Sequence, residues 1–302
     1  MAIKRIAFST DNERKIVENE AKVLRRLNKE QHPHIVRLLF TMERMNDMHN
    51  SRTFNLFFPV AKGMLGDVWD QNGPFEYGKE KGGGVESVRW VAEQLLGIAS
   101  GVATLHDMGK RRDVGNAPTG SPDYGAHIDI KPENLLWFTD DWNAAGPPRG
   151  TIQLADFGEC RFHRSLSRSD IGLTAHSKTY SAPEVELVHF QNILAKGCNL
   201  QRLSRSADIW SLGCVFLEFI SWVALGKQTK KMDGDLHNDD FFVTTFSINR
   251  KKGNFGLPLD KDEVEQDFFY SWKGRARKRP RAVVNPAVVE VSNTCILELT
   301  SF

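Results

Sequence analysis

Hydrophobic positions in the first 60 residues follow both strand-like and helix-like spacing. Residues 2–8 are β-branched and apolar enough for a short strand, and apolar runs at 35–40 and 53–58 predict two more. The segment Thr10–Glu13 has the residue types of a capping box, which predicts a helix over residues 12–29. The N-terminal part is therefore expected to be a small strand-rich unit with one long helix.

The remainder of the chain has a predominantly helical pattern. Apolar residues recur at alternating spacings of three and four over 85–107, which predicts an amphipathic helix. Turn formers fill residues 109–126, so a surface loop is expected there, followed by short strands at 135–138 and 151–155. Residues 207–225 are apolar on nearly all sides, which predicts a buried helix. A last helix is expected near 286–300.

Composition and charge narrow the class of protein. The chain has 302 residues, 40% hydrophobic and 26% charged, which is typical of a soluble globular protein. A net charge of +2 indicates neither a nucleic acid nor a membrane as partner. Four widely spaced cysteines without a CxxC pair indicate no metal site or disulfide framework. Since there is no long apolar run and no signal peptide, an intracellular location, cytoplasmic or nuclear, is expected.

A single carboxylate interrupts the apolar face of the first predicted helix. At about 100° per residue, five apolar side chains lie within about 60° of Glu20, namely Ile16, Val17, Val23, Leu24 and Leu27. Burying a lone carboxylate is costly. Two interpretations remain open: a frayed or partly exposed helix that tolerates the acid, or a buried ion pair with Lys4 of the first strand.

The segment from His127 to Asn134 has the residue types that phosphoryl transfer needs. Asp129 can accept a hydroxyl proton, and Asn134, five residues later, can ligate a metal ion. Lys131 between them can neutralise phosphate oxygens. Three further motifs follow in order, Asp156-Phe157-Gly158 after a short apolar strand, Ala182-Pro183-Glu184, and Asp208 to Gly213 at the start of the buried helix.

In this order and context, the motifs resemble those of a eukaryotic protein kinase domain. Lys131, two residues after Asp129, matches the serine/threonine type, and the stretch before His127 resembles kinases expanded in filamentous fungi. The resemblance implies an α+β, two-lobed fold: residues 1–58 as a partial, β-rich N-lobe with one long helix, 59–63 as the hinge, and 64–302 as a larger helical C-lobe.

The resemblance also implies roles for individual residues, with ATP and Mg²⁺ as cofactors and an unknown protein as substrate. Asp129 is expected to be the catalytic base, with Lys131, Asn134, Lys4 and Glu20 as the other catalytic residues. Asn134 and Asp156 are the expected Mg²⁺ ligands. The expected nucleotide-binding positions are Ala2, Lys4, Phe58, Pro59, Val60, Ala61, Lys131, Glu133, Asn134, Leu136 and Asp156, with Ala2 and Leu136 sandwiching the adenine and Phe58 as gatekeeper.

The resemblance implies structural roles as well. Leu24, His127 and Phe157 match a hydrophobic column between the lobes. Asp208 matches a buried aspartate that accepts hydrogen bonds from the catalytic-loop backbone. Ile128 stands where most kinases have an arginine that pairs with a phosphorylated activation loop, so phosphorylation of that loop is expected to matter less here.

Two departures from the family pattern leave an alternative function open. The first is that the family's glycine-rich loop is expected upstream of Lys4, so the chain is expected to begin at the third strand of the N-lobe. The second is that the chain is expected to be incomplete at its C-terminal end. The alternative is a catalytically weak, kinase-like binding or scaffold module.

The basic tract 273–281 is either a nuclear-localisation or nucleic-acid patch or a solvated loop. Neither a membrane nor a nucleic acid is expected as a partner.

Overall fold

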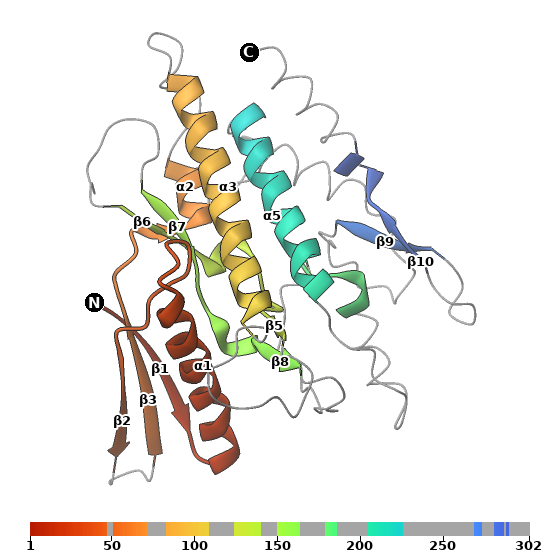
Figure 1. Cartoon of the computed structure of the whole chain (residues 1–302). Helices are drawn as coiled ribbons and strands as arrows, with labels where there is room; N and C mark the ends of the chain where they lie inside the picture. Colours follow the sequence, from red (N-terminus) through yellow and green to blue (C-terminus); the bar gives the residue numbers. More distant parts are fainter. Residues whose placement is uncertain are drawn as a thin grey trace, which may run out of the picture.

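The structure is a computed structural model with two lobes: β1, β3, β2 and α1 form the smaller lobe at the lower left of Figure 1, and the larger lobe lies around the long helices α3 and α5. The smaller lobe contains the N-terminal sheet, and the larger lobe contains the main helices. All structural statements below concern the residues that the structure describes, which are 1–46, 51–71, 83–108, 124–139, 150–163, 179–185, 205–225, 269–273, 281–286 and 288–289.

The N-lobe consists of a three-stranded antiparallel sheet covered on one face by a helix. Its elements are β1 (Ala2–Phe8), α1 (Asp11–Glu30), β2 (Phe40–Asn46) and β3 (Ser51–Phe58), and the strand order is β1-β3-β2. Across the sheet, Lys4 is opposite Leu56, and Leu56 is opposite Thr41. Leu56 is fully buried and belongs to the main core, so this row of residues faces α1.

Helix α1 begins as the sequence predicts. The Thr10 side chain accepts from the Glu13 backbone, and the Glu13 carboxylate accepts from the Thr10 backbone, which completes the capping box. Its buried positions are Val17, Glu20, Ala21, Val23, Leu24 and Leu27. Ile16, expected on this face, is instead 61% exposed. Around the helix axis, Ile16 lies on the same side as Val23 and Leu27, but it is two to three turns closer to the start of the helix. The prediction that Ile16 lies on the buried face was therefore wrong.

The predicted strand at 35–40 was also wrong. Ile35 forms only an isolated bridge with Leu154, and β2 begins at Phe40. The segment before β2 instead bonds to β7 of the C-lobe: the Val36 amide donates to the Leu154 carbonyl, and the Leu154 amide donates to the His34 carbonyl. A buried extended connector and a strand have the same apolar pattern.

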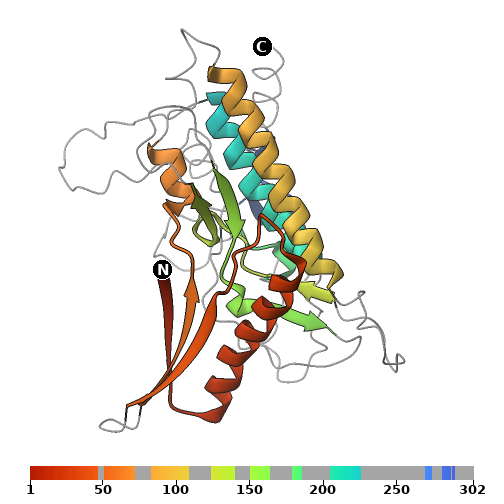
Figure 2. The ribbon, with the colours of Figure 1, turned by 60° about the vertical axis from the view of Figure 1, so that its left-hand side comes forward.

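The C-lobe is built on two long helices that lie side by side in both views (Figures 1 and 2). Residues 59–62 connect β3 to β4 (Gly63–Met64), which is followed by α2 (Leu65–Gln71), α3 (Gly83–Asp107) and later α5 (Arg205–Leu225). Among the described helices, α5 alone has the length and composition of a membrane span, but 61% of its apolar window is buried inside the fold. It is therefore placed as a core helix, as predicted from its all-round apolar pattern.

Short strands and turns complete the C-lobe. They are β5 (Tyr124–Ala126), a 3-10 turn (Pro132–Asn134), β6 (Leu135–Phe138), β7 (Thr151–Leu154), a second 3-10 turn (Phe157–Glu159), β8 (Arg161–His163), β9 (Tyr270–Lys273) and β10 (Arg281–Val284). The sheets are β4-β6-β7, β5-β8 and β9-β10. Residues 124–126 were predicted as loop but pair with β8, and α2 was not predicted.

Two sequence predictions fall largely outside the described residues. Only the ends of the basic tract are described, with Lys273 in β9 and Arg281 in β10. Residues 274–280 and most of the helix predicted at 286–300 lie outside them.

One hydrophobic core joins the two lobes. It includes Leu24 and Leu56 of the N-lobe together with Leu154 and Phe157 of the C-lobe, all at most 1% exposed. Helix α1 and strand β3 therefore pack into the same interior as β7 and the turn that follows it, which fixes the position of the polar groups at the junction.

Candidate active site

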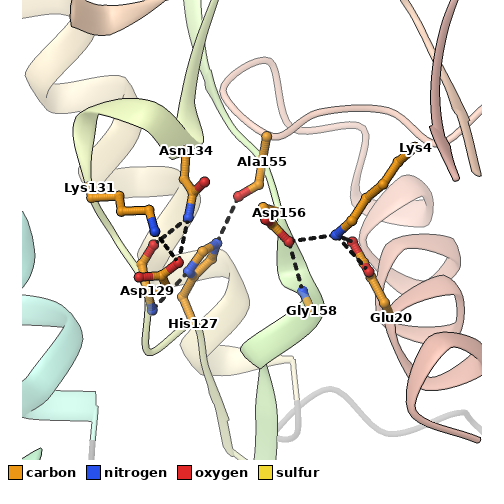
Figure 3. Close-up of polar contacts among 9 residues, drawn as sticks. All are labelled: Lys4, Glu20, His127, Asp129, Lys131, Asn134, Ala155, Asp156 and Gly158. Atoms are coloured by element: carbon orange, nitrogen blue, oxygen red, sulfur yellow. Dashed lines mark hydrogen bonds and ion pairs between the residues drawn. The ribbon is translucent and has the colours of Figure 1, made fainter. Parts of the chain in front are cut away.

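Lys4 connects the N-lobe to the C-lobe through two carboxylates (Figure 3). Its ammonium nitrogen lies 2.8 and 3.0 Å from the two carboxylate oxygens of Glu20 on α1, and 2.7 Å from Oδ1 of Asp156, which follows β7. Glu20 is 3% exposed, so the acid on the apolar face is a buried ion-pair partner and not a sign of a frayed helix. We call Lys4, Glu20 and Asp156 the inter-lobe triad.

Burial and charge act in opposite directions on the pKa values of this triad. Burial raises the pKa of Glu20, and the adjacent Lys4 ammonium only partly offsets this. For Lys4, burial lowers the pKa, but the carboxylates of Glu20 and Asp156 outweigh it, and the net pKa is raised. For Asp156, burial is likewise outweighed by Lys4, and its pKa is lowered. Lys4 and Asp156 are therefore held in their charged forms.

The turn at Asp156 presents its carboxylate to the junction. Asp156 has a left-handed backbone with φ 59° and ψ 75°, a conformation that aspartate tolerates better than most residues. Its Oδ1 accepts from the Gly158 amide at 3.3 Å as well as from Lys4. A Cβ on Gly158 would lie 3.2 Å from the same Oδ1, so any larger residue would push on the carboxylate.

The second polar group lies on the loop between β5 and β6. Lys131 Nζ is 2.8 Å from Oδ2 of Asp129, and the Asn134 amide nitrogen donates to the same oxygen at 2.9 Å and to the Asp129 carbonyl at 2.8 Å. Lys131 and Asn134 thus both contact Oδ2 of Asp129, and they leave its Oδ1 for another partner. We call Asp129, Lys131 and Asn134 the catalytic-loop triad.

The ring of His127 lies beneath this triad as a structural support. The Asp129 amide donates to Nδ1 of His127 at 3.4 Å, so Nε2 carries the hydrogen and donates to the Ala155 carbonyl at 3.0 Å. The ring is fully buried and packs edge-to-face on the Phe157 ring, with the two ring centroids 5.0 Å apart. His127 therefore joins the loop to the segment that carries Asp156, in keeping with the structural role expected for it.

Asp208, in the first turn of α5, holds the same loop by its backbone. Its Oδ2 accepts from the His127 amide and its Oδ1 from the Ile128 amide, each at 2.8 Å. Its Oδ2 also lies 2.8 Å from Nε2 of His106 at the end of α3. Sequence reasoning missed His106, because nothing in its local pattern separates it from the other positions of that helix.

The residues expected around the adenine lie at the junction but form a looser group. Ala2 is opposite Phe58 across β1 and β3, and Leu136 is opposite Met64 across β6 and β4. Phe58 and Leu136 are half-buried against the core, whereas Val60 is 48% exposed. Pro59 and Ala61 are half-buried, Ala2 is exposed, and Glu133 is exposed in the 3-10 turn.

The oxygen atoms of this site suit a hard cation. Asn134 uses its amide nitrogen to hold Asp129, which leaves its amide oxygen to ligate, and the contacts of Asp156 use Oδ1, which leaves Oδ2. Oxygen ligands of this kind suit Mg²⁺, which in phosphate-handling sites takes only one or two protein ligands and fills the rest with water and phosphate oxygens. In keeping with so small a ligand set, no cluster of three or more His, Cys, Asp or Glu side chains fit for a metal occurs among the described residues.

Together the two triads combine functions that phosphoryl transfer requires. They offer a carboxylate that can orient a hydroxyl, two oxygen ligands for a divalent cation, and two ammonium groups that can neutralise phosphate charge.

Comparison with known proteins agrees with this chemistry. The sequence profile of the protein kinase domain matches residues 1–267. A protein named serine/threonine-protein kinase ATG1b, from Arabidopsis thaliana, is 27% identical over 224 residues, which is 73% of this chain and 24% of that protein. A protein named cell division control protein 2 homolog 2, from Trypanosoma brucei brucei, is 29% identical over 199 residues, which is 66% of this chain and 42% of that protein. The chain thus matches less than half the length of either relative.

Proposed function

This chain belongs to the protein kinase domain family, and from that premise we propose that it transfers the γ-phosphoryl group of ATP to serine or threonine hydroxyls of a protein. The observation that carries the proposal is that the two triads lie next to each other (Figure 3): the amide of Ala155, the residue before Asp156, donates to the Asn134 carbonyl at 2.9 Å. Lys4 bonds Asp156 on one side of this link, and Lys131 and Asn134 hold Asp129 on the other. A two-lobed kinase fold supplies the frame.

Asp129 orients the acceptor in this proposal. Its Oδ1 accepts the hydrogen bond of the incoming hydroxyl, because Oδ2 is held by Lys131 and Asn134. The hydroxyl oxygen forms a bond to the γ-phosphorus while the bond from that phosphorus to the bridging oxygen of ADP breaks. The hydroxyl proton passes to Asp129.

Lys131 and Lys4 neutralise phosphate charge from opposite sides. Lys131 is bound to the same carboxylate that receives the acceptor, so its ammonium lies near the transferred group. Lys4 is directed by Glu20, whose buried carboxylate keeps the ammonium at the junction, and it contacts the phosphates nearer the adenosine. Both act by preorganised charge, since their positions are fixed before the reaction.

Asn134 and Asp156 would hold Mg²⁺, since each has a side-chain oxygen that makes no contact within the two triads. The bound cation would supply neutralisation of phosphate charge. The adenine binds at the junction near Ala2, Phe58 and Leu136, with backbone groups of residues 59–61 available for hydrogen bonds.

The test is phosphoryl transfer from γ-labelled ATP to a general acceptor such as dephosphorylated casein. Label is expected on serine or threonine, to depend on Mg²⁺, and to be lost in Asp129→Asn. Label mainly on tyrosine, or equal labelling by Asp129→Asn, would contradict the proposal. Binding of Mg·ATP without transfer would favour the alternative, a kinase-like binding or scaffold module.

A further inference from the structure

Ile128, the residue directly before Asp129, has a costly backbone conformation. Its φ is 72°, in the left-handed region, where a β-branched side chain collides with its own backbone. Such a conformation persists only where the surroundings impose it, and strained residues of this kind cluster at functional sites. The contacts of Ile128 therefore show what the fold gains by holding it.

The backbone of Ile128 is fixed from the side of α5. Its amide donates to Oδ1 of Asp208 at 2.8 Å, while the preceding amide of His127 donates to Oδ2. Asp208 is fully buried, so these bonds are shielded from water. They set the direction in which the chain leaves Ile128 and hence the position of Asp129.

The side chain of Ile128 is fixed from the side of another segment. It is 7% exposed and belongs to a small apolar cluster, separate from the main core, which consists of Ala126, Ile128, Ala182, Val185 and Ala207 with Trp210 packed against it. Ala182 and Val185 come from the segment 179–185, more than 50 residues further along the chain. Ile128 thus brings a side chain of the loop that carries Asp129 into one cluster with side chains of this segment.

The segment 179–185 is itself attached to α5 by hydrogen bonds. Ser211 donates to the Tyr180 carbonyl at 2.8 Å, the Tyr180 hydroxyl donates to Glu218 at 2.6 Å, and Ser206 donates to Glu184 at 3.2 Å. The contact of the segment with Ile128, by contrast, is made of aliphatic side chains. Its strength should therefore depend on packing and not on charge.

We propose that Ile128 is a positioning residue: its side chain fastens the segment 179–185 to the catalytic loop and thereby holds Asp129 in place through an uncharged contact. Loosening that contact lets the strained φ relax, and Asp129 moves with it. The coupling of the two segments is independent of the proposed kinase function. Only its effect on turnover rests on that function.

Amide hydrogen exchange of the full chain tests the coupling directly. Ile128→Ala removes most of the contact, and we expect exchange in residues 127–134 and 179–185 to become roughly tenfold faster. Val185→Ala is expected to act in the same direction from the other side. Ile128→Val keeps the branched side chain and should stay close to the wild type.

Val215→Ala provides the matched control. Val215 is fully buried on α5 but belongs to the main core, so its truncation should lower global stability without selectively exposing the two segments. Unchanged protection in Ile128→Ala, or the same selective loss in Val215→Ala, would overturn the proposal. Exchange that rises only when salt is increased from about 0.05 M to about 0.5 M would also overturn it, since an apolar contact is not screened.

Turnover provides the second readout. In Ile128→Ala, kcat for transfer to casein should fall roughly tenfold or more while KM for ATP changes less than about twofold, because the apolar cluster includes no expected nucleotide residue. Equal changes in both constants would indicate a merely structural role. A wild-type chain that transfers no phosphate would refute the proposed function, while the exchange experiment would still decide the role of Ile128.

Discussion

The two triads of the junction are built in different ways. The inter-lobe triad joins residues 16 and 152 positions apart, and the side chains of Lys4 and Asp156 are 35% and 47% exposed. The catalytic-loop triad lies within six consecutive residues, and its Lys131 and Asp129 are 20% and 16% exposed. The inter-lobe triad is held by charge across the two lobes. The catalytic-loop triad is held because it lies on a short loop that the buried residues Asp208 and His127 fix from below.

This difference separates an adjustable half of the site from a fixed half. A charge contact between half-exposed groups is weakened by salt, so we expect the inter-lobe triad to adjust more readily than the loop if a nucleotide binds. Asp208 and His127 fix the loop from the interior, where water cannot compete for their hydrogen bonds. In the proposed mechanism, the preorganised groups belong to this fixed half.

The largest effect is expected from Asp129, the carboxylate of the fixed half that orients the acceptor in the proposed mechanism. Asp129→Asn should lower phosphoryl transfer by about 10²–10⁴-fold, because the amide cannot accept the hydroxyl proton. Its thermal unfolding should change little, since the amide oxygen can still accept from Lys131. Asp11→Asn, at the exposed start of α1, is the matched control and should leave transfer unchanged.

Removing the buried support should show how strongly the fixed half is held. Asp208→Asn replaces one of two acceptor oxygens by a donor, so an amide of the catalytic loop or the His106 ring loses its partner. The free energy of unfolding should fall by about 2–3 kcal/mol. Urea unfolding measures it. A loss below about 0.5 kcal/mol, as at ordinary surface sites, would mean that the loop is not held from α5.

The adjustable half should be less sensitive to mutation. Lys4→Met leaves Glu20 buried without its cation, but Lys4 itself is partly exposed, so we expect a loss of about 1–3 kcal/mol in unfolding free energy. Adding Glu20→Gln should restore part of it, because an amide costs less to bury than a carboxylate. A double-mutant cycle without interaction energy would contradict the pairing.

The smallest effect is a pH dependence that originates in Glu20. Burial raises its pKa in the folded state above the ordinary value of 4.5, so its contribution to stability is complete below that value and is lost as the pH rises through the raised pKa. The pKa of Asp156 is shifted in the opposite direction, so its contribution to stability is lost only as the pH falls below its ordinary pKa of 3.8. Above about pH 4.5, the unfolding free energy of Glu20→Gln should therefore decline less with pH than that of the wild type. Parallel pH curves would contradict the pKa shift.

The sequence predicted features whose cause is local or is a single buried charge. The capping box at Thr10 sets the start of α1, and the cost of a carboxylate on an apolar face points from Glu20 to Lys4. The buried helix near 207–225 was predictable because its apolar residues cover all sides, and it begins at Arg205.

Features that depend on distant partners were not predictable in the same way. The apolar run at 35–40 predicts a strand, but in the fold β2 begins only at Phe40, and Ile35 and Val36 pair with Leu154 of the C-lobe. His106 acquires its role from Asp208, 102 positions away. The cluster of Ile128 with Val185 likewise arises only when the chain is folded, since nothing in either local pattern points to the other.

Binding of Mg·ATP tests most directly whether the two triads form one site. Titration calorimetry on the wild type should show ATP binding that requires Mg²⁺, weakened at least roughly tenfold by Asp156→Asn or Lys4→Met. Asp11→Asn should bind as the wild type does. ATP binding that is independent of Mg²⁺ and unchanged in Asp156→Asn, or no binding at all, would contradict the account.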